Sequence, residues 1–246
     1  MVFVDGIIAS TGVFIKGGET IELHQKEGVI SSFKRLDFPL EVLFEDDYLA
    51  IINKPAGVVV SGNKFVTIAN ALSQNLTKST LADAVRPQPT HRLDYPTSGL
   101  LLVGKTSASI TALNQLFEAK EIQKTYHAIT IGKMKFNDSI TTLIDGKNAH
   151  TEYTVIKTVD SKRFEYLNLV ALKPKTGRKH QLRIHLANIG HQILGDKEYG
   201  NNEFILKGNG LYLHASTLEF THPFTKELII ITKELPQKFT RIFPTS

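Results

Sequence analysis

The sequence has no cysteine, no tryptophan and no long apolar run. Without cysteine the chain can form no disulfide, no thiolate nucleophile, no iron–sulfur cluster and no cysteine-ligated zinc site. The apolar runs, such as 100–103 and 228–231, are only a few residues long, whereas a membrane-spanning helix needs ~20. Residues 1–6 lack a basic segment and carry Asp5, so no secretory signal is expected. These absences predict a cytoplasmic protein without a membrane span.

Positive charge is in mild excess but is unevenly placed. The chain carries 29 Lys and Arg against 24 Asp and Glu, a formal net charge of +5. Between Leu172 and Leu186 there is no acidic residue, and the basic ones are Lys173, Lys175, Arg178, Lys179 and Arg183. A basic segment in a nearly balanced chain indicates one face that binds an anionic ligand.

The chain divides into a short first part and a long second part. Residues 1–23 alternate short apolar runs with glycines, which predicts small strands joined by turns. The polar stretch 24–37 is typical of a linker. We therefore expect an N-terminal β-rich appendage and linker over 1–40 and a main domain over 41–246.

The main domain shows more strand patterns than helix patterns. Helices are expected after Thr67, after Ser107 and over 180–189, where Thr67 and Ser107 can act as caps and Gly190 can end the third helix. Strands are expected at 49–53, 100–104, 125–131, 152–159, 166–172, 211–215 and 228–232. Because strands and helices do not alternate strictly, the pattern predicts an α+β fold with a mixed, largely antiparallel sheet flanked by helices and loops.

Two loops could carry chemistry. The segment 91–99 places an imidazole, a guanidinium, a carboxylate and two hydroxyls directly before an apolar strand, a common location for reactive groups. From the residues alone, Asp94 could equally make only a local side-chain turn. The segment 176–180 is a basic, glycine-containing loop before a predicted helix, which suits a phosphate but equally suits a solvated helix start.

Several histidines follow this second loop, but their spacing does not indicate a metal site. His180 and His185 would lie about 140° apart around a helix, and no acidic ligand cluster accompanies them. We therefore expect hydrogen-bonding roles for these histidines and no metal.

Together these segments resemble the RluA-type family of RNA pseudouridine synthases. The main likeness is His91-Arg92-Leu93-Asp94 followed by Thr97-Ser98-Gly99-Leu100-Leu101. In the order of that family, the further matching segments are 53–57, 124–128, 176–186, 190–191, 195–196, 199–200 and 213–215. The likeness covers about residues 41–224.

The resemblance implies specific roles for individual residues. Asp94 would be the essential catalytic carboxylate, Tyr126 the aromatic stacked on the uracil and a candidate base for the C5 proton, and Arg183 the partner of Asp94. Arg92 would help to hold the flipped nucleotide. The remaining candidates for contact with RNA are His91, Lys54, Thr97, Arg178, Lys179 and His180.

The implied reaction isomerises uridine to pseudouridine in RNA, with no cofactor and no metal. It breaks N1–C1′, turns the uracil and joins C5 to C1′, which requires an ionised carboxylate close to sugar and base. Whether that carboxylate attacks C1′, adds to C6 or removes the 2′ proton stays open. The target must leave its stack, so a cleft lined by an aromatic residue is expected.

Two departures limit what the resemblance implies about the substrate. Tyr95-Pro96 stands where family members often have a basic and then an acidic residue. Residues 2–23 resemble only the final hairpin of an alpha-L RNA-binding domain, so we expect a reduced RNA-binding role there. Ribosomal and transfer RNA are both open as substrates, and a monomer is expected. The alternative function is a non-catalytic RNA-binding or ribosome-assembly factor on the same fold, and a small-molecule enzyme is a more distant third.

Overall fold

The chain forms two compact units, Met1–Lys34 and Arg35–Ser246, in the computed structural model. The structure describes residues 1–246 except 11, 25–35, 205–207, 209 and 245–246. Most of the linker expected at 24–37 therefore lies outside the described residues. The sequence predicts a domain boundary after residue 40, whereas the two units meet after Lys34. The predicted domain bounds stay a prediction. Each unit is described by itself.

The smaller unit is a three-stranded antiparallel sheet in the order β2-β1-β3. Its strands are β1 (Val2–Val4), β2 (Ile7–Ile8) and β3 (Ile21–Leu23). Asp5 and Gly6 join β1 to β2, and both have positive φ angles, 50° and 77°. This pair is typical of a two-residue hairpin turn, because the turn requires positive φ at both positions.

The larger unit is built on one mixed sheet of ten strands. The main path is β4-β5-β7-β14-β8-β13-β12-β9, with β15 paired to β14 and β6 paired to β7. Among these pairings β7 with β14 is parallel and the others are antiparallel, which confirms the predicted α+β fold. The bounds are β4 Glu41–Glu45, β5 Leu49–Lys54, β6 Ala84–Pro89, β7 Ser98–Thr106, β8 Gln123–Ile131, β9 Asn137–Ile140, β12 Thr151–Ser161, β13 Glu165–Pro174, β14 Leu213–Thr221 and β15 Leu228–Thr232.

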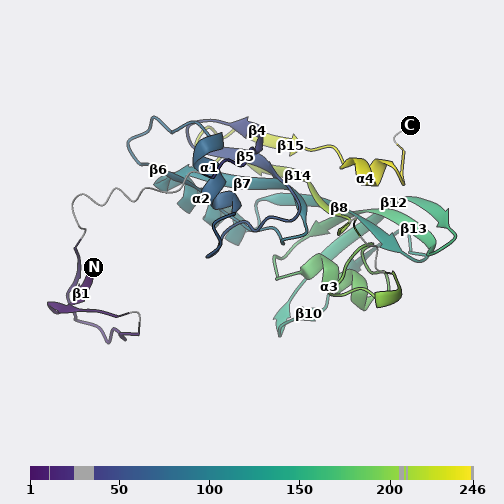
Figure 1. Cartoon of the computed structure of the whole chain (residues 1–246), viewed down its shortest axis with the longest axis horizontal. Coiled ribbons are helices and arrows are strands. Elements are labelled where there is room, and N and C mark those ends of the chain that lie inside the picture. The colour runs from purple at the N-terminus through teal and green to yellow at the C-terminus, as the bar shows by residue number, and fades with distance from the viewer. Residues whose placement is uncertain (11, 25–35, 205–207, 209, 245–246) are drawn as a thin grey trace. The chain divides into compact units, whose positions relative to one another are not determined.

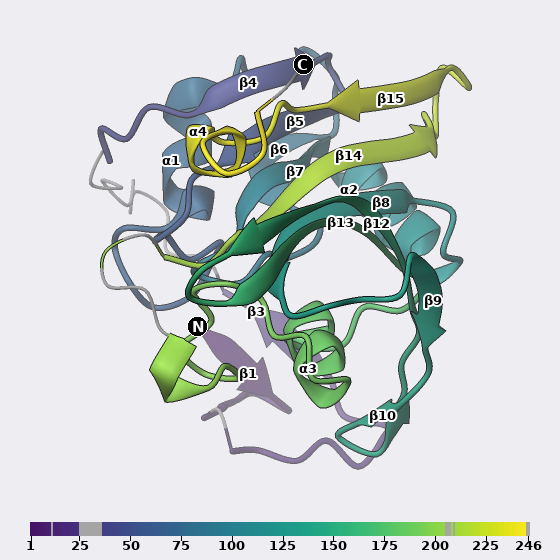
Figure 2. The same cartoon turned by 90° about the vertical axis from the view of Figure 1, so that its right-hand side faces the viewer.

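The helices lie on different parts of this sheet (Figure 1). α1 (Ile68–Asn75) contacts β6, and α2 (Ser107–Glu118) contacts β6 and β7. α3 (Gln181–Asn188) contacts β13 and lies inside its curve (Figure 2). The smaller elements are the hairpin of β10 (Leu143–Ile144) and β11 (Lys147–Asn148), the 3₁₀ turn Asn202–Phe204 and α4 (Gln237–Thr240).

Several predicted boundaries differ from the observed ones by one or more residues. The cap of α2 is Thr106, not Ser107, because Thr106 and Ser109 form a reciprocal capping box. The strand predicted at 211–215 is β14, which begins at Leu213 and continues to Thr221. The cap of α1 is Thr67, as predicted, and its hydroxyl accepts from the backbone N–H of Asn70.

The central strands β5 and β7 are buried on both faces. Ala50 and Ile52 belong to the apolar cluster that includes residues of α1, whereas Leu49 and Ile51 belong to the cluster that includes residues of α2. This alternation follows from the two-residue period of a strand and explains why the runs at 49–52 and 100–103 are continuously apolar. The rigid strand β7 therefore anchors whatever loop precedes it.

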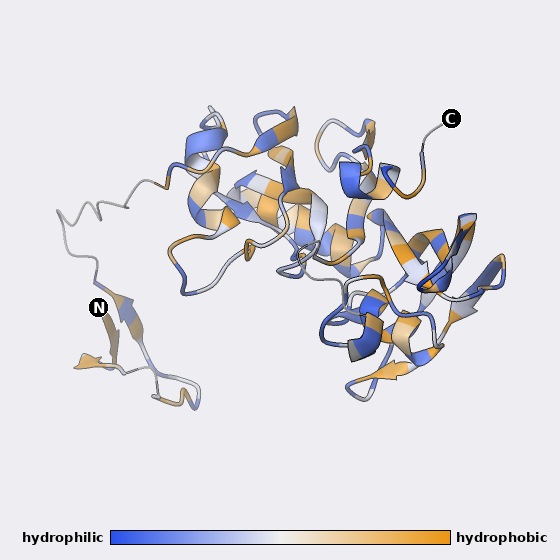
Figure 3. Ribbon diagram, turned by 45° about the vertical axis from the view of Figure 1, so that its right-hand side comes forward, coloured by the Kyte–Doolittle hydropathy of each residue, from blue (hydrophilic) through white to orange (hydrophobic). Residues whose placement is uncertain are grey.

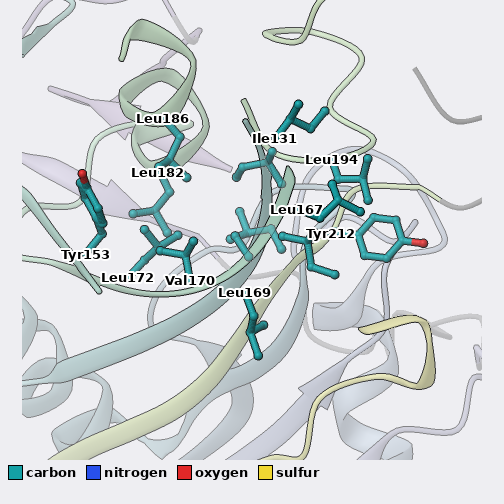
Figure 4. Close-up of a cluster of buried hydrophobic side chains, with 14 of the residues drawn as sticks. Ile131, Tyr153, Leu167, Leu169, Val170, Leu172, Leu182, Leu186, Leu194 and Tyr212 are labelled. Carbon is teal, nitrogen blue, oxygen red and sulfur yellow. The ribbon is translucent and has the colours of Figure 1, made fainter. Parts of the chain in front are cut away.

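A third cluster packs α3 against the sheet. Leu182 and Leu186 lie near Val170 and Leu172 of β13 (Figure 4). The helix also buries polar side chains, namely Gln181, Arg183 and His185, and its many hydrophilic residues are visible in Figure 3. Because buried ionisable groups need partners, this helix is where a functional site is expected.

Candidate active site

The loop between β6 and β7 carries Asp94 and is fixed to the core. The backbone N–H of Leu102 donates to Nε2 of His91 at 3.0 Å, and the backbone N–H of Thr90 donates to the carbonyl of Leu102 at 3.0 Å. The backbone N–H of Thr97 donates to the carbonyl of Asp94 at 3.0 Å and closes the turn. Asp94 therefore has a fixed backbone position at the entry to β7.

His91 acts within this anchor as a neutral ring. Burial first, and then the charge of the nearby Lys124, lower the pKa of His91 to about 3. With Nε2 accepting from the strand, the ring is held in place beside Phe117, at 4.9 Å between ring centroids. His91 lines the cleft described below, but its acceptor nitrogen is already used by β7.

Lys54 lies below the same loop and is fully buried. Its ammonium donates to the carbonyls of Pro55 at 2.9 Å and of Thr97 at 2.8 Å, and it lies 3.5 Å from that of Tyr95. Burial lowers the pKa of Lys54 to about 8, against the opposite influence of Asp94. The prediction that Lys54 contacts RNA is therefore not supported, because its ammonium holds the Asp94 loop instead.

The Asp94 carboxylate faces two side chains of the α3 segment. Nη1 of Arg183 lies 3.8 Å from one carboxylate oxygen, and Nε2 of His180 lies 3.7 Å from the other. The Asp94 side chain is 17% exposed. The predicted Arg183–Asp94 pair is thus present as a long contact, which leaves both oxygens of Asp94 room to approach a ligand.

Arg183 is held mainly by carboxylates that the sequence analysis did not single out. Asp196 accepts from Nε and Nη2 of Arg183 at 2.7 Å each, and Glu198 accepts from Nη2 at 3.0 Å. Burial opposes ionisation of Asp196, but the hydrogen bonds from Arg183 and from backbone N–H groups outweigh it and lower the pKa of Asp196. The bidentate geometry fixes the guanidinium plane, so Nη1 is left to point at Asp94.

His180 is positioned by the same segment. It precedes α3 with a left-handed φ of 55°, and its Nδ1 lies 2.8 Å from the hydroxyl of Tyr199 and 3.3 Å from Glu198. These contacts aim the opposite nitrogen, Nε2, at Asp94. The sequence analysis expected His180 to contact RNA, and the structure adds its proximity to the carboxylate.

A cleft of about 900 Å³ opens above Asp94. Every predicted site residue except Lys54 lines it, and these are His91, Arg92, Asp94, Thr97, Tyr126, Arg178, Lys179, His180 and Arg183. Tyr126 comes from β8 and is half-buried; burial, and then the charge of Asp94, raise its pKa above the ordinary value. The Tyr126 hydroxyl therefore stays protonated at neutral pH.

The rim of the cleft is basic. Arg92, Arg178 and Lys179 are exposed there. Nε of Arg178 donates to the carbonyl of Asn148 at 3.0 Å, whereas the side chains of Arg92 and Lys179 form no hydrogen bond or ion pair with any residue that the structure describes. Thr97 is only 2% exposed, and its main contribution is its carbonyl, which accepts from Lys54. The cleft thus joins a recessed carboxylate to an anion-binding edge.

The comparisons with known proteins agree with this geometry. Residues 48–188 match the family model for RNA pseudouridylate synthase. The chain is 33% identical to the uncharacterised RNA pseudouridine synthase YhcT of Bacillus subtilis, over 91% of this chain and 78% of that protein. It is 31% identical to ribosomal large subunit pseudouridine synthase D of Xanthomonas campestris, over 97% of this chain and 79% of the relative.

A solved structure is similar across most of both chains. Human RNA pseudouridylate synthase domain containing 4 has a TM-score of 0.66 and 25% identity, over 81% of this chain and 90% of the human one. The resemblance to pseudouridine synthases is confirmed, and the catalytic function is supported over a non-catalytic RNA-binding one. The chain belongs to the RNA pseudouridylate synthase family and is an enzyme that isomerises uridine to pseudouridine in RNA.

Proposed function

We propose that Asp94 is the catalytic carboxylate and that its substrate is a uridine in large-subunit ribosomal RNA. The observation that carries the first part is the position of Asp94. It lies in the cleft, between Arg183 at 3.8 Å and His180 at 3.7 Å, with Tyr126 lining the same cleft. The guanidinium of Arg183 places a positive charge beside this carboxylate.

The chemistry is an isomerisation, so its atoms balance within the substrate. The N1–C1′ bond breaks, the uracil turns, a C5–C1′ bond forms, C5 loses a proton and N1 gains one. No electron acceptor, reductant or donated group enters, which supports the expectation that no cofactor or metal takes part. The protein has to hold the uracil while it is detached, and the half-buried ring of Tyr126 offers a stacking surface.

The basic rim supports RNA as the partner. Arg92, Arg178 and Lys179 can each contact a backbone phosphate around the flipped uridine. Ribosomal RNA is favoured over transfer RNA because relatives of this chain are named ribosomal large subunit pseudouridine synthase D. The proposal includes a monomer acting in the cytoplasm, as the sequence leads us to expect.

The test is turnover of RNA labelled with tritium at C5 of uridine, because forming C5–C1′ releases that hydrogen. Transcribed large-subunit ribosomal RNA and transfer RNA serve as separate substrates. We expect release from the ribosomal RNA, none with Asp94→Asn, and unchanged RNA affinity in that variant. Retained release by Asp94→Asn contradicts the assignment of Asp94, and release from transfer RNA alone contradicts the assignment of the substrate.

Tyr126→Phe separates stacking from proton transfer. The ring remains in the variant, so we expect RNA affinity to be retained. Any loss of tritium release then measures what the hydroxyl contributes.

A further inference from the structure

The cleft extends beyond the space around Asp94. A volume of about 900 Å³ is near the upper end of the ~300–1,000 Å³ typical of pockets for drug-sized ligands, whereas the reaction needs one nucleotide. Its far part lies where α2 ends and β8 and β14 meet, and is lined by Phe117, Glu118, Lys120, Gln123, Lys124, Thr217 and Glu219. This part is assigned no role by the reaction described above.

Strand geometry relates this far part to the uracil site. Lys124 and Tyr126 are two residues apart on β8, so their side chains leave the same face of the strand, about 7 Å apart along it. The pairing of β13 with β8 ends at Tyr126, so Lys124 lies outside the part of β8 that pairs with β13. A ligand stacked on Tyr126 can therefore continue along β8 to Lys124, over a step comparable to one nucleotide of extended RNA.

The ammonium of Lys124 lacks an anionic partner. Lys124 is half-buried, and within the described part of the chain its side chain forms no hydrogen bond or ion pair. Its Nζ lies 5.5 Å from the centroid of the Phe117 ring, and burial lowers its pKa. The buried Lys105, by contrast, is paired with Glu45 at 2.7 Å. A partly desolvated cation without a counter-charge gains most from a bound anion.

Resting on the proposed function, we propose that Lys124 binds the RNA phosphodiester next to the uridine held beside Asp94. The flanking phosphate would replace the missing counter-charge of Lys124 while the target uracil lies on Tyr126. Glu118 and Glu219 line the same part of the cleft. Their charges oppose a second phosphate, so this subsite takes a single one.

The test measures binding of a fluorescein-labelled pentaribonucleotide, AAUAA, to the full chain carrying Asp94→Asn. Lys124→Met is compared with Lys162→Met, which removes the same charge from an exposed position that does not line the cleft. We expect Lys124→Met to weaken binding about tenfold and to reduce the slope of log affinity against log salt by about 0.7. Lys124→Arg should restore both, and Lys162→Met should change neither. Equal effects of Lys124→Met and Lys162→Met overturn the proposal.

A neutral methylphosphonate linkage then locates the contact. Placed next to the uridine, it should weaken binding to the protein with Lys124 but cause no further loss with Lys124→Met. Additive losses overturn the proposal, because they place the phosphate and Lys124 in separate contacts. The outcome is distinct from failure of the proposed function, which would appear as tritium release by Asp94→Asn on transcribed RNA.

Discussion

At the scale of single residues, the arginine that faces Asp94 is itself held in place by a buried carboxylate, Asp196. Arg183 is 4% exposed, and two of its nitrogens donate hydrogen bonds to Asp196, which is 3% exposed. A buried pair of this kind contributes little net stability compared with apolar packing, but removing one partner leaves an uncompensated buried charge. Its role here is to fix the direction of Nη1 toward Asp94.

Asp196→Asn is therefore expected to reduce both stability and turnover. Loss of the carboxylate leaves Arg183 buried with the more exposed Glu198 as its closest remaining partner, so the free energy of unfolding should fall by about 3 kcal/mol. Tritium release should fall although Asp196 does not line the cleft. Denaturant unfolding and turnover on the same preparations measure the two effects. The control is Glu198→Gln. Because the Glu198 side chain is half-exposed, loss of its ion pair with Arg183 should lower the free energy of unfolding by less than about 1 kcal/mol.

The pair of Arg183 and Asp196 also predicts that the free energy of unfolding depends on pH in acid. The folded-state pKa of Asp196 lies below its unfolded value, so the ionised carboxylate stabilises the fold above the unfolded pKa of about 3.9. That stabilisation is lost as pH falls from there through the lower folded pKa. Urea unfolding between pH 3 and 6 should show a smaller decline for Asp196→Asn than for the unaltered chain. Parallel curves would contradict this.

Lys54 predicts a second dependence of the same sign at alkaline pH, where stability again rises with pH. Its folded pKa is about 8 and its unfolded pKa about 10.4, so between these values the unfolded chain binds more protons and stability rises with pH. The rise in the free energy of unfolding that is attributable to Lys54 is about 3 kcal/mol. It appears as a difference between the unaltered chain and Lys54→Met, measured by urea unfolding at pH 7 to 10.5. If the free energies of unfolding of the two proteins differ by the same amount at every pH in this range, Lys54 does not titrate there, and the prediction is contradicted.

At the scale of elements, the start of β7 is the tightest point next to the loop that carries Asp94. Gly99 has a φ of 117°, and a Cβ there would lie 2.2 Å from the carbonyl oxygen of Ala215 on β14. Gly99 pairs with Ala215 in the parallel ladder of the sheet. No side chain fits between these strands unless they separate.

Gly99→Ala is expected to lower the free energy of unfolding by about 3 kcal/mol or more and to reduce turnover, because Asp94 lies five residues before it, in the loop that leads into β7. The matched control is Gly57→Ala, where φ is also positive, 83°, but the nearest atom to a Cβ is the Tyr95 hydroxyl at 3.9 Å. In that variant the free energy of unfolding should fall by only about 1 kcal/mol, because alanine is strained at a positive φ. Equal losses in the two variants would show that the clash with β14 relaxes.

The sequence predicts most elements of the main domain because their periodicity is local. Strand β6 was missed because Pro87 and Pro89 argue against a strand; the ladder tolerates them because β6 pairs on one side only, with β7. The roles of Asp196 and Lys54 were missed for a different reason. Their partners are 13 and 43 residues away in the chain, so no local pattern indicates a buried ion pair or a buried ammonium.

At the scale of the whole molecule, every element of the site belongs to the larger unit. The cleft residues run from Thr90 to Glu219, and the supporting Lys54 also lies within Arg35–Ser246. In the part of the chain that the structure describes, no helix is long and apolar enough to span a membrane. The ten-stranded sheet brings β7, β8, β13 and β14 together, so the site depends on this sheet as a whole.

Deleting residues 1–24 is therefore expected to leave the enzyme active. The smaller unit has its own hydrogen-bonded sheet, whose strands β2 and β3 are exposed throughout. Among its described residues, none lines the cleft. The thermal unfolding midpoint of the remaining chain should change little, and tritium release should be retained. Loss of release with an unchanged midpoint would contradict the reduced role expected for this end. Affinity for transcribed ribosomal RNA, measured at several salt concentrations, would then show whether the smaller unit contributes phosphate contacts, because each lost contact lowers the salt slope.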